Sequence, residues 1–189
     1  MIYRKLRICY YVGFTLIEVL ISILILSIAV IGAIKMQINS IQMTQQSNYF
    51  STAVELATEI AEKMRGNGVQ LQSAASPFLK VNFHAGTDKI ESSTTCFSAN
   101  CSPDQLAESD IAEWLQHISS SLPDAHAVIC QDDSPWDGGD NSLTWNCAAS
   151  GNKSSVIIKL GWAEKKQASQ TGFLIAPPRL AIAVISTIN

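Results

Sequence analysis

Glu18 has the most unusual setting of any ionisable residue in this sequence. It lies within residues 14–34, a run of 21 positions whose other polar members are only Thr15, Ser22 and Ser27. An unpaired carboxylate in hydrocarbon costs about 2.5–3.5 kcal/mol on insertion scales. Glu18 is therefore expected to require a cationic partner, which would let it act as a registration device between packed apolar helices.

The cysteines are the second set of residues that can do chemistry. Cys9 lies near the N-terminus, and four more follow at Cys96, Cys101, Cys130 and Cys147. Their spacing does not resemble that of a zinc site, so disulfides in an oxidising compartment are favoured over a metal. We expect one bond from Cys96 to Cys101 across a short loop and another from Cys130 to Cys147 between adjacent strands, although four cysteines permit three connectivities.

An acidic loop and three histidines complete the candidates. Residues 131–142 place four aspartates around Trp136, at positions Asp132, Asp133, Asp137 and Asp140. Carboxylate oxygens suit Ca²⁺, but the ligand spacing of an EF-hand is not met, so we expect a solvated loop and no metal. His84, His117 and His126 are isolated in the sequence and are interpreted as structural.

The chain carries no recognisable enzyme signature. GxSxG, a phosphate-cradling glycine loop, HExxH and kinase elements are all missing from the sequence. We therefore expect no enzymatic activity, cofactor or small-molecule substrate. The net charge is −3, only 15% of residues are charged, and no basic run follows Arg7, which argues against nucleic-acid binding through a bulk basic surface.

The apolar run predicts a membrane-spanning helix. At about 1.5 Å per residue, residues 14–34 would form a helix about 31 Å long, which matches a bilayer core. A cleaved secretory signal has an apolar region of about 7–15 residues, which is shorter. Arg4, Lys5 and Arg7 precede the run and predict a cytoplasmic N-terminus, with the rest of the chain outside.

Residues 13–20 read GFTLIEVL, which resembles the signature of type IV prepilins and type II secretion pseudopilins. The resemblance implies that a prepilin peptidase cuts between Gly13 and Phe14 and methylates the new amine of Phe14. It also implies that Glu18 serves assembly by pairing with the N-terminal amine of a neighbouring subunit. Residues 1–13 would then be a leader whose loss removes Cys9 and three basic residues and changes the net charge from −3 to −6.

Beyond the apolar run, residues 35–66 continue as an amphipathic pattern. Apolar and small residues recur at steps of three and four, and no proline occurs before Pro77. Gly66 and Gly68 then provide a stop. The sequence therefore predicts one helix from Phe14 to about Arg65, with one face of its second half covering a head domain.

Residues 67–189 are expected to form an α+β head. Ser102, Pro103 and Gln105 predict a capped helix start, and Pro123 marks the end of that helix. Four strands are expected at residues 125–131, 142–149, 155–163 and 179–186. A long N-terminal helix on such an antiparallel sheet is the type IV pilin-like architecture that the resemblance implies.

More of the chain resembles PilV-like minor pilins than major pilins. The matching segments are the unbroken start GFTLIEVLIS, the runs SDIAEWL at 109–115 and SVIIKLGWAE at 155–164, and the step Leu122-Pro123. The implied function is initiation and assembly of type IV pili, in a priming or tip complex. Adhesion, twitching motility and DNA uptake are processes of that machine, and the sequence assigns none of them.

The resemblance also implies partners and a location. The partners would be other minor and major pilins, the prepilin peptidase, the inner-membrane assembly platform and, before assembly, membrane lipid. The protein would be a single-pass inner-membrane protein with a periplasmic head and would then enter the pilus. The alternatives are a minor pseudopilin of a type II secretion system and, more remotely, a membrane-anchored periplasmic enzyme or sensor.

Overall fold

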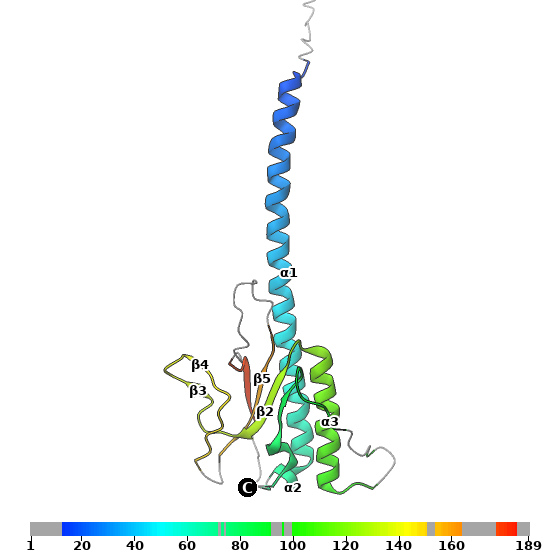
Figure 1. Cartoon of the computed structure of the whole chain (residues 1–189), viewed down its shortest axis with the longest axis vertical. Helices are drawn as coiled ribbons and strands as arrows, with labels where there is room; N and C mark the ends of the chain where they lie inside the picture. The colour runs from blue at the N-terminus through cyan, green and yellow to red at the C-terminus, as the bar shows by residue number, and fades with distance from the viewer. Residues whose placement is uncertain are drawn as a thin grey trace, which may run out of the picture. The chain divides into compact units, whose positions relative to one another are not determined.

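Helix α1 (Leu16–Gly66) and an antiparallel sheet dominate the computed structural model of the chain (Figure 1). The structure describes residues 13–71, 73, 75–91, 96, 100–150, 154–163 and 177–184, so most of the expected leader lies outside the described residues. The chain divides into two units, residues 1–45 and 46–189.

The first unit consists of the N-terminal part of α1. The helix begins at Leu16, two residues later than expected, because Gly13, Phe14 and Thr15 are not helical. The carbonyl of Thr15 accepts hydrogen bonds from the backbone N–H groups of Glu18 (3.1 Å) and Val19 (3.3 Å) and so starts the helical ladder.

The second unit contains the end of α1. The helix ends at Gly66, and the short helix α2 (Gly68–Leu71) follows directly. Six residues on one side of this last part are buried: Ala53, Leu56, Ala57, Ile60, Ala61 and Met64. Their steps of three and four place them on one face, so a packed face is confirmed for residues 53–64, whereas residues 35–48 of the expected amphipathic segment are all exposed.

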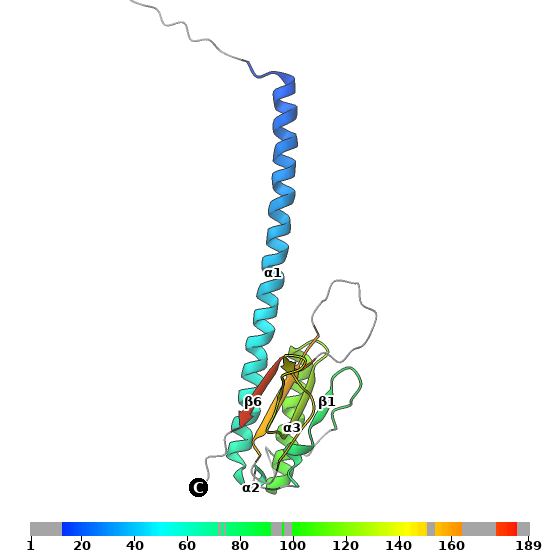
Figure 2. The same ribbon diagram turned by 90° about the vertical axis from the view of Figure 1, so that its left-hand side faces the viewer.

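A four-stranded antiparallel sheet with the order β1-β2-β5-β6 forms the rest of the scaffold (Figure 2). Its strands are β1 (Asn82–His84), β2 (His126–Gln131), β5 (Val156–Gly161) and β6 (Leu180–Val184). The two-residue strands β3 (Trp136–Asp137) and β4 (Ser142–Leu143) pair as a separate antiparallel hairpin. The expected α+β class is therefore confirmed.

Helix α3 (Pro103–Ser121) has the predicted N-terminal cap. The Ser102 hydroxyl accepts from the backbone N–H of Gln105 (3.3 Å), and the Gln105 side chain accepts from the backbone N–H of Ser102 (3.0 Å). This reciprocal pair is a capping box, and Pro103 fits the first helical position because it has no N–H to satisfy. The helix ends just before Pro123, as expected.

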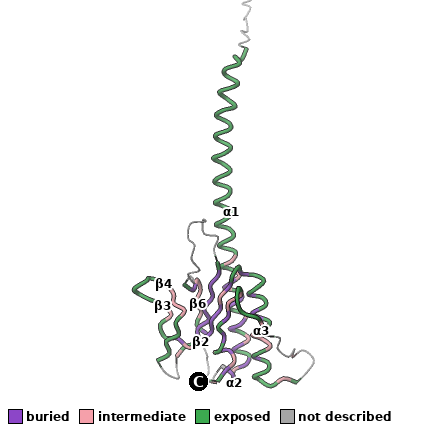
Figure 3. The backbone as a smooth tube through the Cα atoms, in the orientation of Figure 1, coloured by how far each residue is buried: buried purple, intermediate pink, exposed green. Residues whose placement is uncertain are grey.

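The core lies between helices α1 and α3 and one face of the sheet (Figure 3). Val156, Ile158 and Leu160 alternate along β5 and contribute the sheet face. Trp114 of α3 is completely buried, and its indole N–H donates to the carbonyl of Leu56 on α1 (2.8 Å). This bond fixes the two helices against each other within the core.

Several elements of the head differ from expectation. The strand expected over residues 142–149 is reduced to Ser142–Leu143, and the 3-10 helix η1 (Pro77–Lys80) and strand β1 were not predicted. The segment after β4 cannot join a ladder because the carbonyls of Thr144 and Asn146 accept hydrogen bonds from the side chain of Lys159 instead. Residues 185–186 of the last expected strand lie outside the described residues.

Candidate functional site

The junction between Gly13 and Phe14 precedes helix α1 and is exposed. The side chain of Phe14 is 81% exposed, and a Cβ added at Gly13 would meet no atom within 4 Å. The peptide bond is thus held in neither a helix nor a packed contact. An enzyme that cuts here would find a non-helical, accessible chain.

Glu18 lies in the first turn of α1, where unpaired backbone N–H groups and the helix dipole favour a carboxylate. The two serines of the apolar run satisfy their hydroxyls locally, since Ser22 donates to the carbonyl of Glu18 and Ser27 donates to that of Ile23, both at 2.7 Å. Among the described residues, the carboxylate of Glu18 has neither a hydrogen bond nor an ion pair. In a membrane, this carboxylate would be expected to take a partner from another molecule.

The first unit presents apolar side chains on all sides of the helix. Every residue from 13 to 48 is exposed, and consecutive residues such as Leu24, Ile25 and Leu26 are each more than 60% exposed. The most apolar 18-residue window has a mean hydropathy of 2.7 and is not buried at all. By length and composition this helix can cross a membrane, and an apolar surface all round is typical of a spanning helix.

Both expected disulfides are present in the head. Cys96 is bonded to Cys101 with a Cα–Cα distance of 5.8 Å, and Cys130 is bonded to Cys147 with a distance of 6.1 Å. The predicted setting of the second bond was wrong, because Cys147 belongs to the irregular segment after β4 rather than to a strand. The bond therefore ties β2 to that segment. Cys9 lies outside the described residues.

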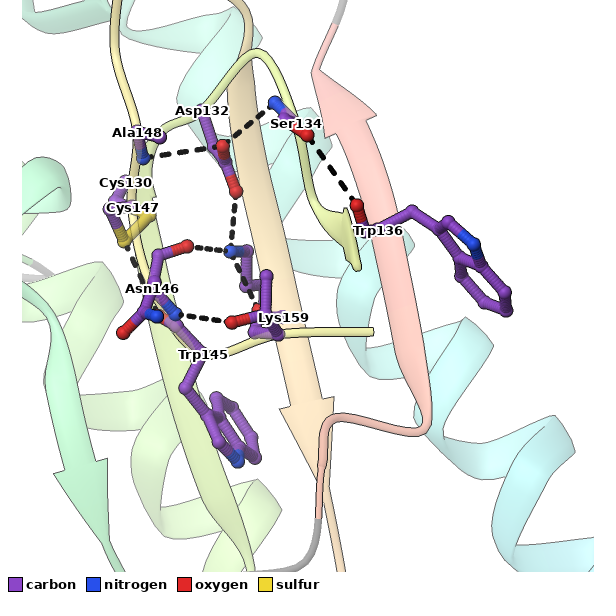
Figure 4. A network of polar contacts seen from close by, with 10 residues as sticks. Cys130, Asp132, Ser134, Trp136, Trp145, Asn146, Cys147, Ala148 and Lys159 are labelled. Carbon is purple, nitrogen blue, oxygen red and sulfur yellow. Dashed lines mark hydrogen bonds and ion pairs between the residues drawn. A yellow bond between two sulfur atoms is a disulfide. The ribbon is translucent and has the colours of Figure 1, made fainter. Parts of the chain in front are cut away.

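A buried ion pair lies beside the second disulfide (Figure 4). The ammonium of Lys159 on β5 is 2.5 Å from the carboxylate of Asp132, and both side chains are fully buried. Lys159 also donates to the carbonyls of Thr144 (2.8 Å) and Asn146 (2.6 Å), so all three of its protons are used. The expectation that the whole acidic loop is solvated was therefore wrong for Asp132.

Asp132 is fully satisfied as well. Burial raises its pKa, but the hydrogen bond from Lys159 and the backbone N–H groups of Ser134 (2.9 Å) and Ala148 (3.3 Å) outweigh burial, so the pKa lies below its usual range. The sequence signal that could have predicted this pair is a single lysine in the apolar strand VIIKLG, which follows an acidic loop along the chain.

Two further aspartates of the loop, Asp133 and Asp137, accept hydrogen bonds from backbone N–H groups. Asp133 accepts from the backbone N–H of Ser150 and from the hydroxyl of Ser154, both at 2.8 Å, while Asp137 accepts from the N–H of Gly139 at 2.8 Å. Within the described part of the chain, no three His, Cys, Asp or Glu side chains are arranged to hold a metal ion.

None of the three histidines is isolated in space, contrary to their isolation in the sequence. His84 and His126 face each other across β1 and β2, with ring centroids 5.5 Å apart, and His126 stacks on Trp145 at 3.9 Å. Burial, together with repulsion from His84, lowers the pKa of His126. His117 lies on α3, with its Nδ1 3.5 Å from a carboxylate oxygen of Glu59 on α1.

Two family models match adjoining parts of the chain. The model of the prokaryotic N-terminal methylation motif matches residues 13–34, which include the Gly13–Phe14 junction, Glu18 and the apolar surface. The model described as type IV pilin Tt1218 matches residues 35–112, which continue along α1 into α3. No curated protein and no solved structure gives a significant match.

The two matches meet without a gap between residues 34 and 35, inside a single helix. The first match covers the apolar N-terminal part of α1. The second includes the part of α1 that packs with the antiparallel sheet. On these grounds the chain is similar to type IV pilins over residues 13–112, and the two matches together support a type IV pilin.

Proposed function

We propose that this protein is a minor pilin of the PilV-like kind that takes part in the initiation and assembly of type IV pili. A prepilin peptidase cuts between Gly13 and Phe14 and methylates the amine of Phe14. The observation that carries the proposal is the exposed junction followed, within one helical turn, by a carboxylate without a partner among the described residues. The match to the N-terminal methylation motif supports the same assignment.

In this proposal Glu18 selects the axial position of a neighbouring subunit. After cleavage, the amine of Phe14 is mostly protonated near neutral pH, since a reference α-amine has a pKa of about 7.7–8.0. Within one chain this amine would lie about 6 Å along the axis from Glu18 if the helix extended to Phe14. A neighbour staggered along the axis brings its own amine to Glu18 directly, and the low dielectric of packed apolar helices strengthens this pair.

The same proposal gives the protein its location and partners. Before assembly, the apolar surface of residues 14–34 lies in the inner membrane, with the N-terminus in the cytoplasm and the head in the periplasm, where its two disulfides persist. The inner-membrane assembly platform then transfers it to other minor and major pilins. The pilin family is structural, and we propose no enzymatic activity for this member.

The first test replaces Glu18 by alanine in cells that make the full chain. We expect normal cleavage, read by mass spectrometry as a methylated Phe14 at the start of the membrane-bound protein, and at least tenfold less of the variant in sheared surface fibres. Glu55→Ala is the matched control, because Glu55 is an exposed glutamate on the same helix outside the apolar run. Equal amounts of both variants in the fibres would contradict the role of Glu18.

The second test separates the pilus from type II secretion. The proposal expects the native protein in sheared fibres and fewer pili in a strain that lacks it, with normal protein secretion. Lost secretion with normal pili would instead identify a minor pseudopilin. An unprocessed Met1 in the membrane-bound protein would exclude both and leave a membrane-anchored protein of another kind.

A further inference from the structure

The outer face of the sheet carries a contact that joins β2 to the segment after β4. This face is the one turned away from the core, and it carries His126 and Lys159, because Ala127, Ile158 and their alternate neighbours point into the core. Trp145, from the segment after β4, stacks on the ring of His126 with centroids 3.9 Å apart and an angle of 30° between the rings.

Gly161 makes room for the indole of Trp145. A Cβ atom added at Gly161 would lie 2.8 Å from Cζ2 and 3.0 Å from Cη2 of that ring, closer than carbon atoms pack. The carbonyls of Thr144 and Asn146, on either side of Trp145, accept hydrogen bonds from Lys159 (Figure 4). The backbone on both sides of the tryptophan is therefore held in place, and its side chain is the part that can change position.

The hydrogen bonds of His126 fit a neutral ring. Its Nε2 lies 3.1 Å from the amide oxygen of Asn82, which only accepts, so Nε2 carries the proton. Its Nδ1 is buried and has no hydrogen-bond partner among the described residues. A second proton would have to bind Nδ1, because both nitrogens of a charged imidazole are donors. That N–H would then be buried without an acceptor, which is unfavourable.

The charged groups around His126 do not remove this obstacle. The ring of His84 on β1 is 5.5 Å away and, once charged, repels a proton on His126. Asp124 lies 3.9 Å from Nδ1 of His84 and so favours a charge on that ring. Asp88 attracts the proton, but its effect on the pKa of His126 is smaller than those of burial and His84. Lys159, on the same face, is already neutralised in its buried ion pair.

The segment on the other side of the ring offers no compensation either, because residues 144–149 contain no acidic side chain. An imidazolium is attracted to the face of an indole, but this attraction is weaker than the cost of burying an N–H without an acceptor. We propose that the contact of His126 with Trp145 is a pH-sensitive latch: in acid His126 becomes charged, the two rings separate, and the indole leaves Gly161 and becomes exposed.

The direction of the latch follows from linkage. The closed contact lowers the pKa of His126 from its ordinary value of 6.5, whereas a ring that has moved into water regains that value. The open state therefore binds protons more readily, so the closed state predominates above pH 6.5 and opening is favoured as the pH falls below it. In acidic surroundings the head then presents an additional aromatic ring on the outer face of its sheet.

The test uses the full processed chain in detergent, with every tryptophan replaced by 5-fluorotryptophan. The ¹⁹F resonance of Trp145 is identified by its absence in Trp145→Phe. The difference between its positions in H₂O and in D₂O reports the access of water to the ring, and so distinguishes exposure from a change in nearby charge. Between pH 7.5 and pH 5.0 we expect this difference to rise at least twofold for Trp145 and to stay unchanged for Trp114, which is buried in the core.

Three variants sharpen the test. His126→Gln removes the titrating ring, so the water access of Trp145 is expected to be the same at both pH values. Gly161→Ala fills the space beneath the indole and is expected to give high water access already at pH 7.5. His117→Gln is the matched control, because it alters an exposed histidine on α3 and should leave the response of the native protein unchanged.

Circular dichroism of each variant at both pH values checks that the head stays folded. Unchanged water access of Trp145 in the native protein, an equal rise in His126→Gln, or low access in Gly161→Ala at pH 7.5 would overturn the proposal. A rise that Trp114 shares would also overturn it, since the head would then be unfolding as a whole. None of these results bears on cleavage at Gly13 or incorporation through Glu18.

Discussion

Lys159 lies in the middle of β5, yet its side chain is fully buried. Replacing it by methionine keeps the length of the side chain and leaves Asp132 as a buried, unpaired carboxylate. We expect the free energy of unfolding of the head to fall by about 3–5 kcal/mol. Urea unfolding of the full chain in detergent, followed by tryptophan fluorescence, measures the change.

Two variants control this experiment. Lys80→Met alters an exposed lysine and is expected to change the free energy of unfolding by no more than about 0.5 kcal/mol. Combining Lys159→Met with Asp132→Asn removes the unpaired charge but keeps an oxygen that accepts from Ser134 and Ala148, so part of the loss should be recovered. A Lys159→Met protein as stable as Lys80→Met would contradict the account of the pair.

His126 makes the stability of the head depend on pH. Its pKa is lowered from 6.5 by burial and then by His84, while Asp88 opposes this slightly. The unfolded chain therefore binds the proton more readily than the folded one, so stability is greatest above pH 6.5 and falls as the pH drops below it. Unfolding measured between pH 7.5 and 5 should show this slope, and His126→Gln should flatten it.

The expected control for this slope is His117→Gln, which alters an exposed histidine on α3 and leaves the β1–β2 pair intact. The lowered pKa of Asp132 acts in a different window. Its contribution is lost only as the pH falls below 3.8, so it does not confuse the measurement. A slope unchanged by His126→Gln would show that another group is responsible.

At the scale of elements, the two disulfides close loops of different length. Cys130 and Cys147 are 17 residues apart, and Cys96 and Cys101 are 5 apart. From chain entropy, replacing the first pair by serines should reduce the free energy of unfolding by about 3 kcal/mol and replacing the second pair by about 2 kcal/mol. Denaturant unfolding of both double variants tests the order, and the reverse order would contradict it.

The helices and the central strands could be predicted because their signals are local. The capping box at Ser102 and the apolar periodicity of α1 depend on residues three and four positions apart, and β2 and β5 are long apolar runs. The segment after β4 was predicted as a strand because its residue types suit one. Its carbonyls are taken by Lys159, 15 and 13 positions away, and local patterns do not report such a contact.

The residues of the candidate site also divide into those that a local sequence pattern predicts and those that only the three-dimensional structure brings together. Gly13, Phe14 and Glu18 follow from a contiguous motif, and the structure adds that the junction is exposed and that the serines beside Glu18 satisfy their own hydroxyls. Trp145 falls within the strand expected over residues 142–149. Its contact with His126 depends on a segment that Lys159 holds against the sheet, so it became visible only in three dimensions.

At the scale of the whole molecule, the chain combines two units that differ in whether their side chains are buried within the chain. Residues 46–189 have a core, a sheet and two disulfides of their own. Residues 13–45 have no buried side chain. The two family models meet at residue 34, close to this division. The N-terminal methylation motif and the second matched segment therefore lie in adjoining stretches of the sequence.

The exposed apolar helix has a consequence for the life of the protein in the cell. More than thirty consecutive residues of this helix are exposed. Keeping their apolar surface in contact with water is unfavourable, because each Å² of it forgoes about 25 cal/mol of burial free energy. A dissolved monomer is therefore a state that the cell must avoid. If the protein assembles as proposed, each copy has to leave the lipid only as other helices close around it, so extraction from the membrane and growth of the polymer would be a single event.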